Sequence, residues 1–156
     1  MLAWLESTSI AVWLGESPSV WAMPTVLTLH TTGMAVLVGA SWLLDLRLLG
    51  LNKNVPLSNY RWVFSAVAIG LLVNLITGVL LFMKNATSWG TAFPFLVKML
   101  FVVASTATIL PIRKYVLNSS VGRDEVTSNL RLLAIASIVA WSAAVTAGRL
   151  LAYLVV

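Results

Sequence analysis

Four long apolar segments occupy most of this 156-residue chain. They lie at residues 20–43, 61–83, 92–111 and 130–153. A helix needs about 20 apolar residues to cross the hydrocarbon core of a bilayer, so each segment is long enough to span it. Charged residues make up only 10% of the sequence, against about 25% in soluble domains. We therefore predict an all-α, integral membrane four-helix bundle that forms a single transmembrane domain over residues 1–156.

The basic residues are distributed unevenly over the connections between these segments. Those in or beside the first and third connections are Arg47, Lys53, Arg61, Arg113, Lys114, Arg123 and Arg131. The second connection holds only Lys84. Because loops rich in Lys and Arg stay in the cytoplasm, this asymmetry predicts a multi-pass protein of the bacterial inner (cytoplasmic) membrane with both termini periplasmic. The net charge of +5 follows from this topology, so nucleic acid is not an expected partner.

The residues before the first segment do not resemble a signal peptide, because Glu6 and Glu16 stand where a positive region would be needed. Their apolar residues are Leu2, Trp4, Leu5, Ile10, Trp13 and Leu14. This pattern predicts a short N-terminal amphipathic helix in the outer membrane interface. Pro18 and Pro24 would then redirect the chain into the first span. Asp124 and Glu125 are predicted to open the lead-in to the fourth span, where negative charge suits a helix N-terminus.

Two of the segments carry small side chains, or an amide, at intervals of four residues. They are Ala66, Gly70, Asn74 and Gly78 in the second, and Ala136, Ala140, Ala144 and Gly148 in the fourth. Small residues at this spacing let membrane helices approach closely, which predicts a compact bundle. Asn74 additionally needs a hydrogen-bond partner at this depth.

Polar side chains occur inside all four segments: His30, Asn74, Lys98 and Arg149, of which His30 is the chain's single histidine. Ionisable groups are costly in a membrane and usually mark a functional position. From the rise of a helix, we expect all of them about 9–15 Å below the outer boundary. A bundle that turned these faces inward would assemble one polar site. Alternatively, Lys98 and Arg149 extend to the headgroups, and His30 joins helices through Asn74 or a backbone carbonyl.

Imidazole is an axial ligand of haem iron, and neighbouring cations can neutralise haem propionates. We therefore expect His30, Lys98, Arg149 and Asn74 to bind haem b, with His30 and Lys98 as the metal ligands. The alternatives for the second ligand are a histidine from a second subunit or none, with Lys98 then close to the haem edge. Copper is the alternative, because Met23, His30 and Met34 share a helical face and thioethers favour Cu(I). About 10.5 Å of helical rise separates Met23 from His30, which disfavours copper.

The residues give little sign of catalysis. The chain has no cysteine, which excludes thiolate metal sites and CxxCH haem attachment. The spans hold no acid to pair with His30 as a base, because Asp45 is expected at the inner boundary. Catalytic residues therefore cannot be assigned from the sequence.

Three stretches carry a family resemblance: LHTTGMAVLVGASWLLDLRLLG from Leu29, TGVLLFMKNATSWGTAFPFLVKMLF from Thr77, and AGRLLAYL from Ala147. They resemble a widespread family of small bacterial four-helix integral membrane proteins. More distantly, the arrangement is similar to HemJ-type protoporphyrinogen oxidases and CopD-like copper-resistance membrane proteins. In HemJ-type proteins an early histidine and a later lysine, after a TG…F…K pattern, are implicated in binding haem b. His30 and Lys98 match these residues in order and context.

The resemblance has a departure, since HemJ-type proteins have an LPR-like turn where this chain has the residues 44–47, LDLR. The sequence thus predicts a haem b-binding, cytochrome b-like protein in electron transfer or redox chemistry near the periplasmic side. Its expected partners are the lipid bilayer and a membrane redox partner or quinone. One alternative is a non-enzymatic accessory subunit of a larger membrane complex, or a homo-oligomer, in which the chain packs through its small residues. Another is a CopD-like copper-handling protein.

Overall fold

The computed structural model describes residues 2–118 and 126–154, and the elements in these residues are all helical. They are α1 (Leu2–Glu6), α2 (Ser9–Glu16), α3 (Ala22–Leu49), η1 (Leu57–Tyr60), α4 (Val63–Lys84), α5 (Ala86–Trp89), α6 (Phe93–Asn118) and α7 (Ser128–Leu154). The helices α3, α4, α6 and α7 are long and apolar enough to cross a membrane. The predicted all-α membrane four-helix bundle is therefore confirmed.

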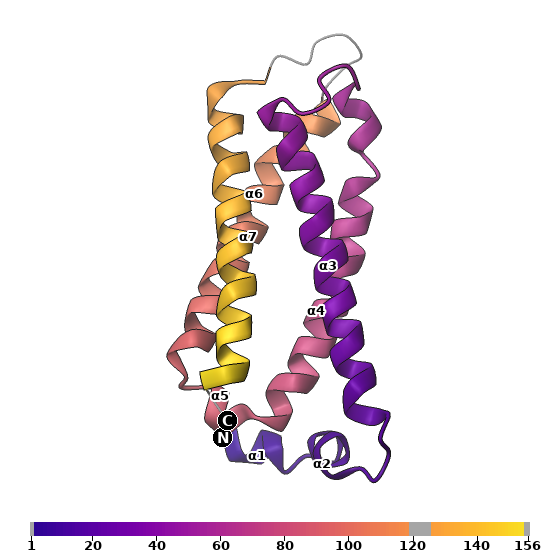
Figure 1. Cartoon of the computed structure of the whole chain (residues 1–156), viewed down its shortest axis with the longest axis vertical. Coiled ribbons are helices and arrows are strands. Elements are labelled where there is room, and N and C mark those ends of the chain that lie inside the picture. The colour runs from indigo at the N-terminus through magenta and orange to yellow at the C-terminus, as the bar shows by residue number, and fades with distance from the viewer. Residues whose placement is uncertain (1, 119–125, 155–156) are drawn as a thin grey trace.

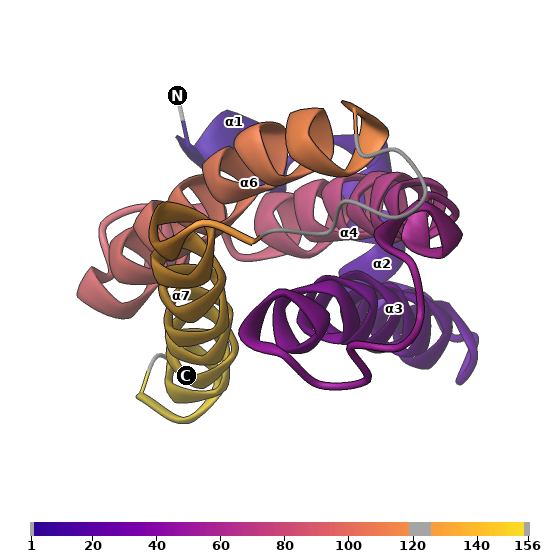
Figure 2. The same ribbon diagram turned by 90° about the horizontal axis from the view of Figure 1, so that it is seen from above.

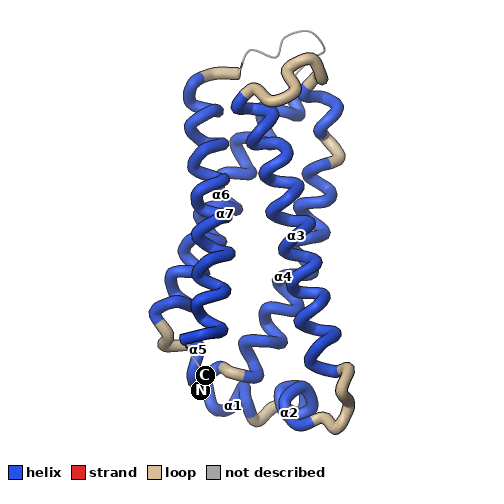
Figure 3. Tube along the Cα trace, viewed as in Figure 1, coloured by secondary structure: helices blue, strands red, loops and turns tan. Residues whose placement is uncertain are grey.

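The long helices run alongside one another as two hairpins, α3 with α4 and α6 with α7 (Figure 1). The hairpins meet mainly where α3 packs against α7, so the order around the bundle is α4, α3, α7, α6 (Figure 2). The short helices α1 and α2 lie across one end of the bundle (Figure 3), with α1 against α5 and α2 against α4. We call this the α1–α2 end. At the opposite end, η1 packs against α6.

The outward faces of the bundle are covered by large apolar side chains. On α4 alone, Ile69, Leu72, Leu75 and Ile76 are each more than half exposed. Continuous apolar surface of this kind is rare on soluble monomers and marks contact with a membrane or another protein. The surface therefore agrees with a lipid environment.

Helix α3 is longer than the sequence predicts, because it continues past the expected loop start at Asp45 to Leu49. Gly50 then adopts a φ of 111°, which glycine tolerates best. The Gly50 N–H donates to Arg47 O at 3.1 Å and the Leu51 N–H donates to Leu46 O at 2.9 Å. These two bonds form the Schellman ending of a helix.

The sequence places Arg47 in or beside the loop after the first span. In the structure it belongs to α3, and its side chain is buried. Its Nε donates to Val55 O at 2.9 Å and its Nη2 to Lys53 O at 3.2 Å. Arg47 therefore ties down the loop that follows α3.

The N-terminal residues form two short helices, α1 and α2, rather than the single one predicted. Pro18 lies between α2 and α3, but Pro24 lies in the first turn of α3. Proline is tolerated there because the first N–H groups of a helix have no partner inside it. The predicted lead-in residues Asp124 and Glu125 and the predicted loop residue Arg123 lie outside the described residues.

Helices α3 and α4 approach closely where Gly33 meets Gly70. A Cβ added to Gly70 would lie 2.8 Å from Leu37 N and 2.9 Å from Gly33 O. Gly70 thus belongs to a tight helix contact, as its spacing predicts. On α7, Ala140 and Ala144 are buried whereas Ala136 is exposed, so only part of that predicted contact line faces inward.

Candidate functional site: a cavity between the hairpins

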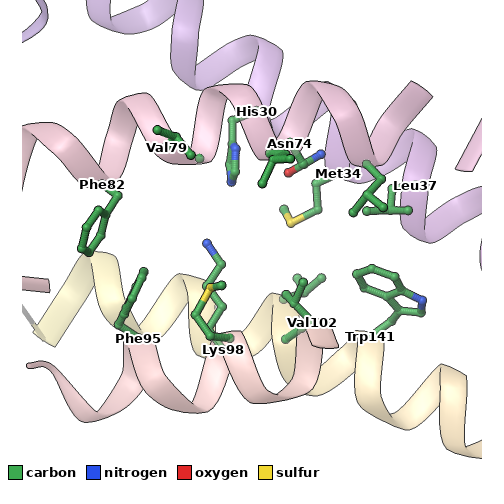
Figure 4. A pocket seen from close by; sticks show the side chains of 16 residues that line it. His30, Met34, Leu37, Asn74, Val79, Phe82, Phe95, Lys98, Val102 and Trp141 are labelled. Carbon is green, nitrogen blue, oxygen red and sulfur yellow. The ribbon is translucent and has the colours of Figure 1, made fainter. Parts of the chain in front are cut away.

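A cavity of about 280 Å³ lies between the two hairpins, in the half of the bundle nearer the α1–α2 end. All four long helices contribute to its walls, which are mostly apolar. Three of the polar residues predicted from the sequence, His30, Asn74 and Lys98, line it together (Figure 4). The structure therefore brings side chains from three helices to one site.

Aromatic side chains close the two ends of this cavity. Towards the α1–α2 end, the rings of Phe82 and Phe95 stack with centroids 5.1 Å apart and an interplanar angle of 21°. At the other end lies the indole of Trp141 (Figure 4). Between α4 and α6, the lining residues Leu75 and Met99 are also exposed on the bundle surface. The cavity consequently opens sideways, towards the position of lipid.

The orientation of His30 is set by Thr77, which is buried on α4. His30 Nδ1 lies 2.8 Å from Thr77 Oγ1. The Thr77 hydroxyl itself donates to Val73 O at 2.6 Å. A hydroxyl has one proton to donate, so with that proton on Val73 O, Thr77 Oγ1 accepts from the Nδ1–H of His30. The Nε2 atom of His30 then carries a free lone pair.

Glycines on the facing helices make room for the two candidate ligands. A Cβ on Gly78 would lie 3.4 Å from His30 Cε1, so the imidazole lies against this glycine. A Cβ on Gly148 would lie 3.7 Å from both Cδ and Cε of Lys98. The Lys98 stem thus passes over α7, and its ammonium points into the cavity towards His30 (Figure 4).

Asn74 has a different partner from the one considered in the sequence. Its Nδ2 donates to Gly70 O of its own helix at 3.1 Å. The residue that holds His30 is Thr77, which the sequence analysis did not single out. A signal was present, since Thr77 and Gly78 begin the second stretch of the family resemblance and lie on the α4 face that carries Asn74.

Arg149 is the one predicted site residue that the structure does not bring to the cavity, because its side chain is exposed on α7. Met34 and Met99 line the cavity with His30, whereas Met23 does not. Among the described residues, no group of three His, Cys, Asp or Glu side chains is placed to hold a metal ion. Any metal here would therefore need imidazole, amine or thioether ligands.

Fold and site together define a class: a four-helix membrane bundle whose laterally open, apolar cavity presents an imidazole and an ammonium group to each other. Comparisons of the chain with protein-family models, curated proteins and solved structures found no match.

Proposed function

We propose that this chain is a haem b-binding membrane protein in which His30 supplies an axial nitrogen. The observation that carries the proposal is the 2.8 Å contact between His30 Nδ1 and Thr77 Oγ1, because a Thr77 hydroxyl that donates to Val73 O accepts from Nδ1–H and leaves Nε2 unprotonated in the apolar cavity. Metal-ligating histidines nearly always donate their second N–H to such a partner, which fixes the ring and its tautomer. An imidazole held in this way is a suitable axial ligand for haem iron.

Lys98 faces His30 and would have one of two roles. Its amine would take the second axial position, or its ammonium would neutralise a haem propionate. The side chains lining the cavity include no carboxylate in the described chain, so the ammonium has no acidic partner in these walls. Arg149, expected to meet a propionate, is not placed for that role in this structure.

The cavity volume also bears on the fit. At about 280 Å³ it is slightly smaller than typical ligand pockets, which run from about 300 to 1,000 Å³. A tetrapyrrole would therefore extend through the opening between α4 and α6, with its edge towards lipid. A bound haem would supply one-electron chemistry, and a membrane quinone or redox partner would meet it at this opening. The residues of the chain would orient the ring plane and exclude water.

The resemblance of His30 and Lys98 to the HemJ-type histidine and lysine supports haem binding. It gives much less support to oxidase activity, because the LPR-like turn is replaced here. We accordingly propose binding and electron transfer as the function, and no substrate.

Visible spectroscopy tests this function directly. Protein purified from haem-replete cells should show a Soret band that shifts on reduction with dithionite, and His30→Ala should lose it. Thr77→Val keeps the side-chain shape but removes the acceptor for Nδ1–H, so haem affinity should fall about 10–100-fold. Thr31→Ala, on the exposed side of α3, is the matched control and should bind normally. A wild-type protein that stays colourless after haemin is added contradicts the proposal.

Copper is the second candidate, favoured by the two thioethers of Met34 and Met99 in the same cavity as His30. Soft sulfur ligands with imidazole suit Cu(I). Met34→Leu separates the two candidates. It should abolish Cu(I) binding if copper is the ligand, and leave the reduced haem spectrum nearly unchanged if haem is. If neither ligand binds, the accessory-subunit interpretation becomes the leading one.

We further propose that the α1–α2 end faces the periplasm and that the protein lies in the inner membrane of a bacterium. The described basic residues at the opposite end are Arg47, Lys53, Arg61, Arg113, Lys114 and Arg131, and such residues favour the cytoplasmic side. The chain has no cysteine of its own. Ser88→Cys and Asn54→Cys, both at exposed positions, can therefore be labelled with an impermeant reagent in intact spheroplasts. Ser88→Cys alone should react, and the reverse pattern contradicts this orientation.

A further inference from the structure

A second, much smaller cavity lies in the half of the bundle away from the α1–α2 end. It has a volume of about 10 Å³ and is lined by all four long helices. Its polar lining residues are Ser41, Asp45 and Ser137. A space of about 10–15 Å³ is the least that can hold one water molecule. The cavity is therefore large enough for a water but for no organic ligand.

Asp45 is the unexplained group at this cavity. Its side chain is only 2% exposed, and its Oδ2 has no hydrogen-bond partner within the described chain. The Ser137 hydroxyl, on a residue 1% exposed, interacts with the same carboxyl group. One carboxyl oxygen is thus left for a partner that the described side chains do not supply.

The Oδ2 atom of Asp45 accepts no hydrogen bond from a basic side chain of the described residues. On its own helix, the Arg47 guanidinium donates to the backbone of the following loop. Helix α4 carries no ionisable side chain before Lys84 at its far end. The basic residues of α6 and α7 at this end of the bundle are Arg113, Lys114 and Arg131, and all of them are exposed. A carboxylate buried without a counter-ion is so costly that the group normally takes up a proton instead.

The two cavities are stacked along the bundle axis. On α3, Leu37 lines the larger one and Ser41 the smaller. On α7, Trp141 lines the larger and Ser137 the smaller. Each pair is one helical turn apart, or about 6 Å of rise. The indole Nε1 of Trp141 is also buried without a hydrogen-bond partner in the described residues, so a second unpartnered polar group lies at this end of the larger cavity.

We propose that Asp45, Ser137 and one bound water form a buried proton-exchange site in the smaller cavity. The proton is held as an O–H bond on the Asp45 carboxyl. On exchange that bond breaks as the proton passes to the water oxygen, and the water returns one of its other protons to the carboxyl, so that an O–H bond on Asp45 and a neutral water are restored. No electrons move in this step. The site does not depend on which ligand occupies the larger cavity.

Infrared spectroscopy of the full chain reconstituted in lipid tests this proposal. The sequence has only five acidic residues, so a protonated carboxyl band can be assigned by substitution. At neutral pH the wild type should show one such C=O band, and the band should shift in D₂O because its proton exchanges with water. Asp45→Asn should remove it. Glu16→Gln, at an exposed position, is the matched control and should leave it unchanged.

Two further variants keep the test decisive if Asp45→Asn does not fold. Ser137→Ala should shift the frequency of the band, because the carboxyl group loses its hydroxyl partner. Asp45→Glu should retain a band at an altered frequency. The proposal is overturned if the wild type shows no protonated carboxyl band, if the band survives Asp45→Asn, or if it does not respond to D₂O.

Discussion

The half of the bundle near α1 and α2 and the half beyond it are built from the same four helices, yet their interiors differ. The first encloses about 280 Å³ between the hairpins, and the second leaves only about 10 Å³. Each half holds buried polar side chains, but His30 and Lys98 face a space that opens towards lipid, whereas Asp45 is sealed in. The open half can exchange a ligand with the bilayer, and the closed half can exchange only water or protons.

Side-chain volume explains much of this contrast. In the closed half, Leu48, Leu57, Val63 and Val116 are all at most 1% exposed and fill the space between the hairpins. In the open half, glycines lie beneath the candidate ligands, at Gly78 beside His30 and at Gly148 beside Lys98. Large residues therefore fill the interior at one end, and glycines at the other leave room for the His30 and Lys98 side chains.

The largest effect should come from adding volume to the closed half. Ala134 is 0% exposed, and Ala134→Leu should lower the free energy of unfolding by about 1–3 kcal/mol or more. Ala144 is 4% exposed but lines the open cavity, so Ala144→Leu should cost clearly less. Thermal unfolding in detergent measures both variants. Equal losses of stability would mean that the two interiors do not differ as described.

A smaller loss of stability is expected from disturbing the α3–α4 contact inside one hairpin. A tight contact there would show that the opening lies between the hairpins. Gly70→Ala places a Cβ 2.8 Å from Leu37 N on α3, so this backbone contact must shift and stability should fall by about 1–3 kcal/mol. Gly39 has nothing within 4 Å of an added Cβ and is the matched control. Gly39→Ala should raise stability by about 0.5–1 kcal/mol, because alanine is the better helix former. The same unfolding assay applies, and a Gly70→Ala protein as stable as Gly39→Ala would contradict a tight α3–α4 contact.

The smallest effect on stability is expected at the contact between α1 and α5, at the end of the open half. Glu6 Oε1 accepts hydrogen bonds from Thr87 Oγ1 at 2.6 Å and from Thr87 N at 2.8 Å. These bonds hold the pKa of Glu6 below its ordinary value of 4.5. A lowered carboxyl pKa contributes stability above the ordinary pKa, and this is lost as the pH falls through the folded-state value.

The wild type should therefore melt slightly above Glu6→Gln at neutral pH, and the difference should begin to shrink as the pH falls below about 4.5 and vanish below the folded-state pKa of Glu6. Glu16→Gln, at the exposed end of α2, should match the wild type throughout. A difference between wild type and Glu6→Gln that persists unchanged in acid would show that the carboxylate is not responsible.

The sequence predicts the fold well because four uninterrupted apolar segments have few ways to be buried. It also predicts that His30, Asn74 and Lys98 share a site, since helical rise alone places them at one depth. It cannot predict rotation about the helix axes, which decides that Arg149 faces outward while Lys98 faces in. Because the rotation of α4 is also unknown from the sequence, the contact between Thr77 and His30, 47 residues apart, could not be predicted.

The buried Asp45 escaped prediction for a related reason. The sequence places it at the start of a charged loop, and a carboxyl group there would normally face water. The extension of α3 to Leu49 instead carries it into the packed half. In the structure, the Schellman ending at Gly50 marks the end of the helix. In the sequence, a glycine followed by several polar residues is also compatible with a helix that ends earlier.

The central claim is that His30 offers an unprotonated Nε2 to the open cavity. Because the chain has a single histidine, ¹⁵N nuclear magnetic resonance of histidine-labelled protein in lipid reports on this ring alone. The account predicts, for the ligand-free protein at neutral pH, a protonated Nδ1 and an unprotonated Nε2, with the proton exchanging faster in Thr77→Val. A protonated Nε2 with a bare Nδ1 would contradict it, because the ring would then present a donor to the cavity and could not ligate a metal there.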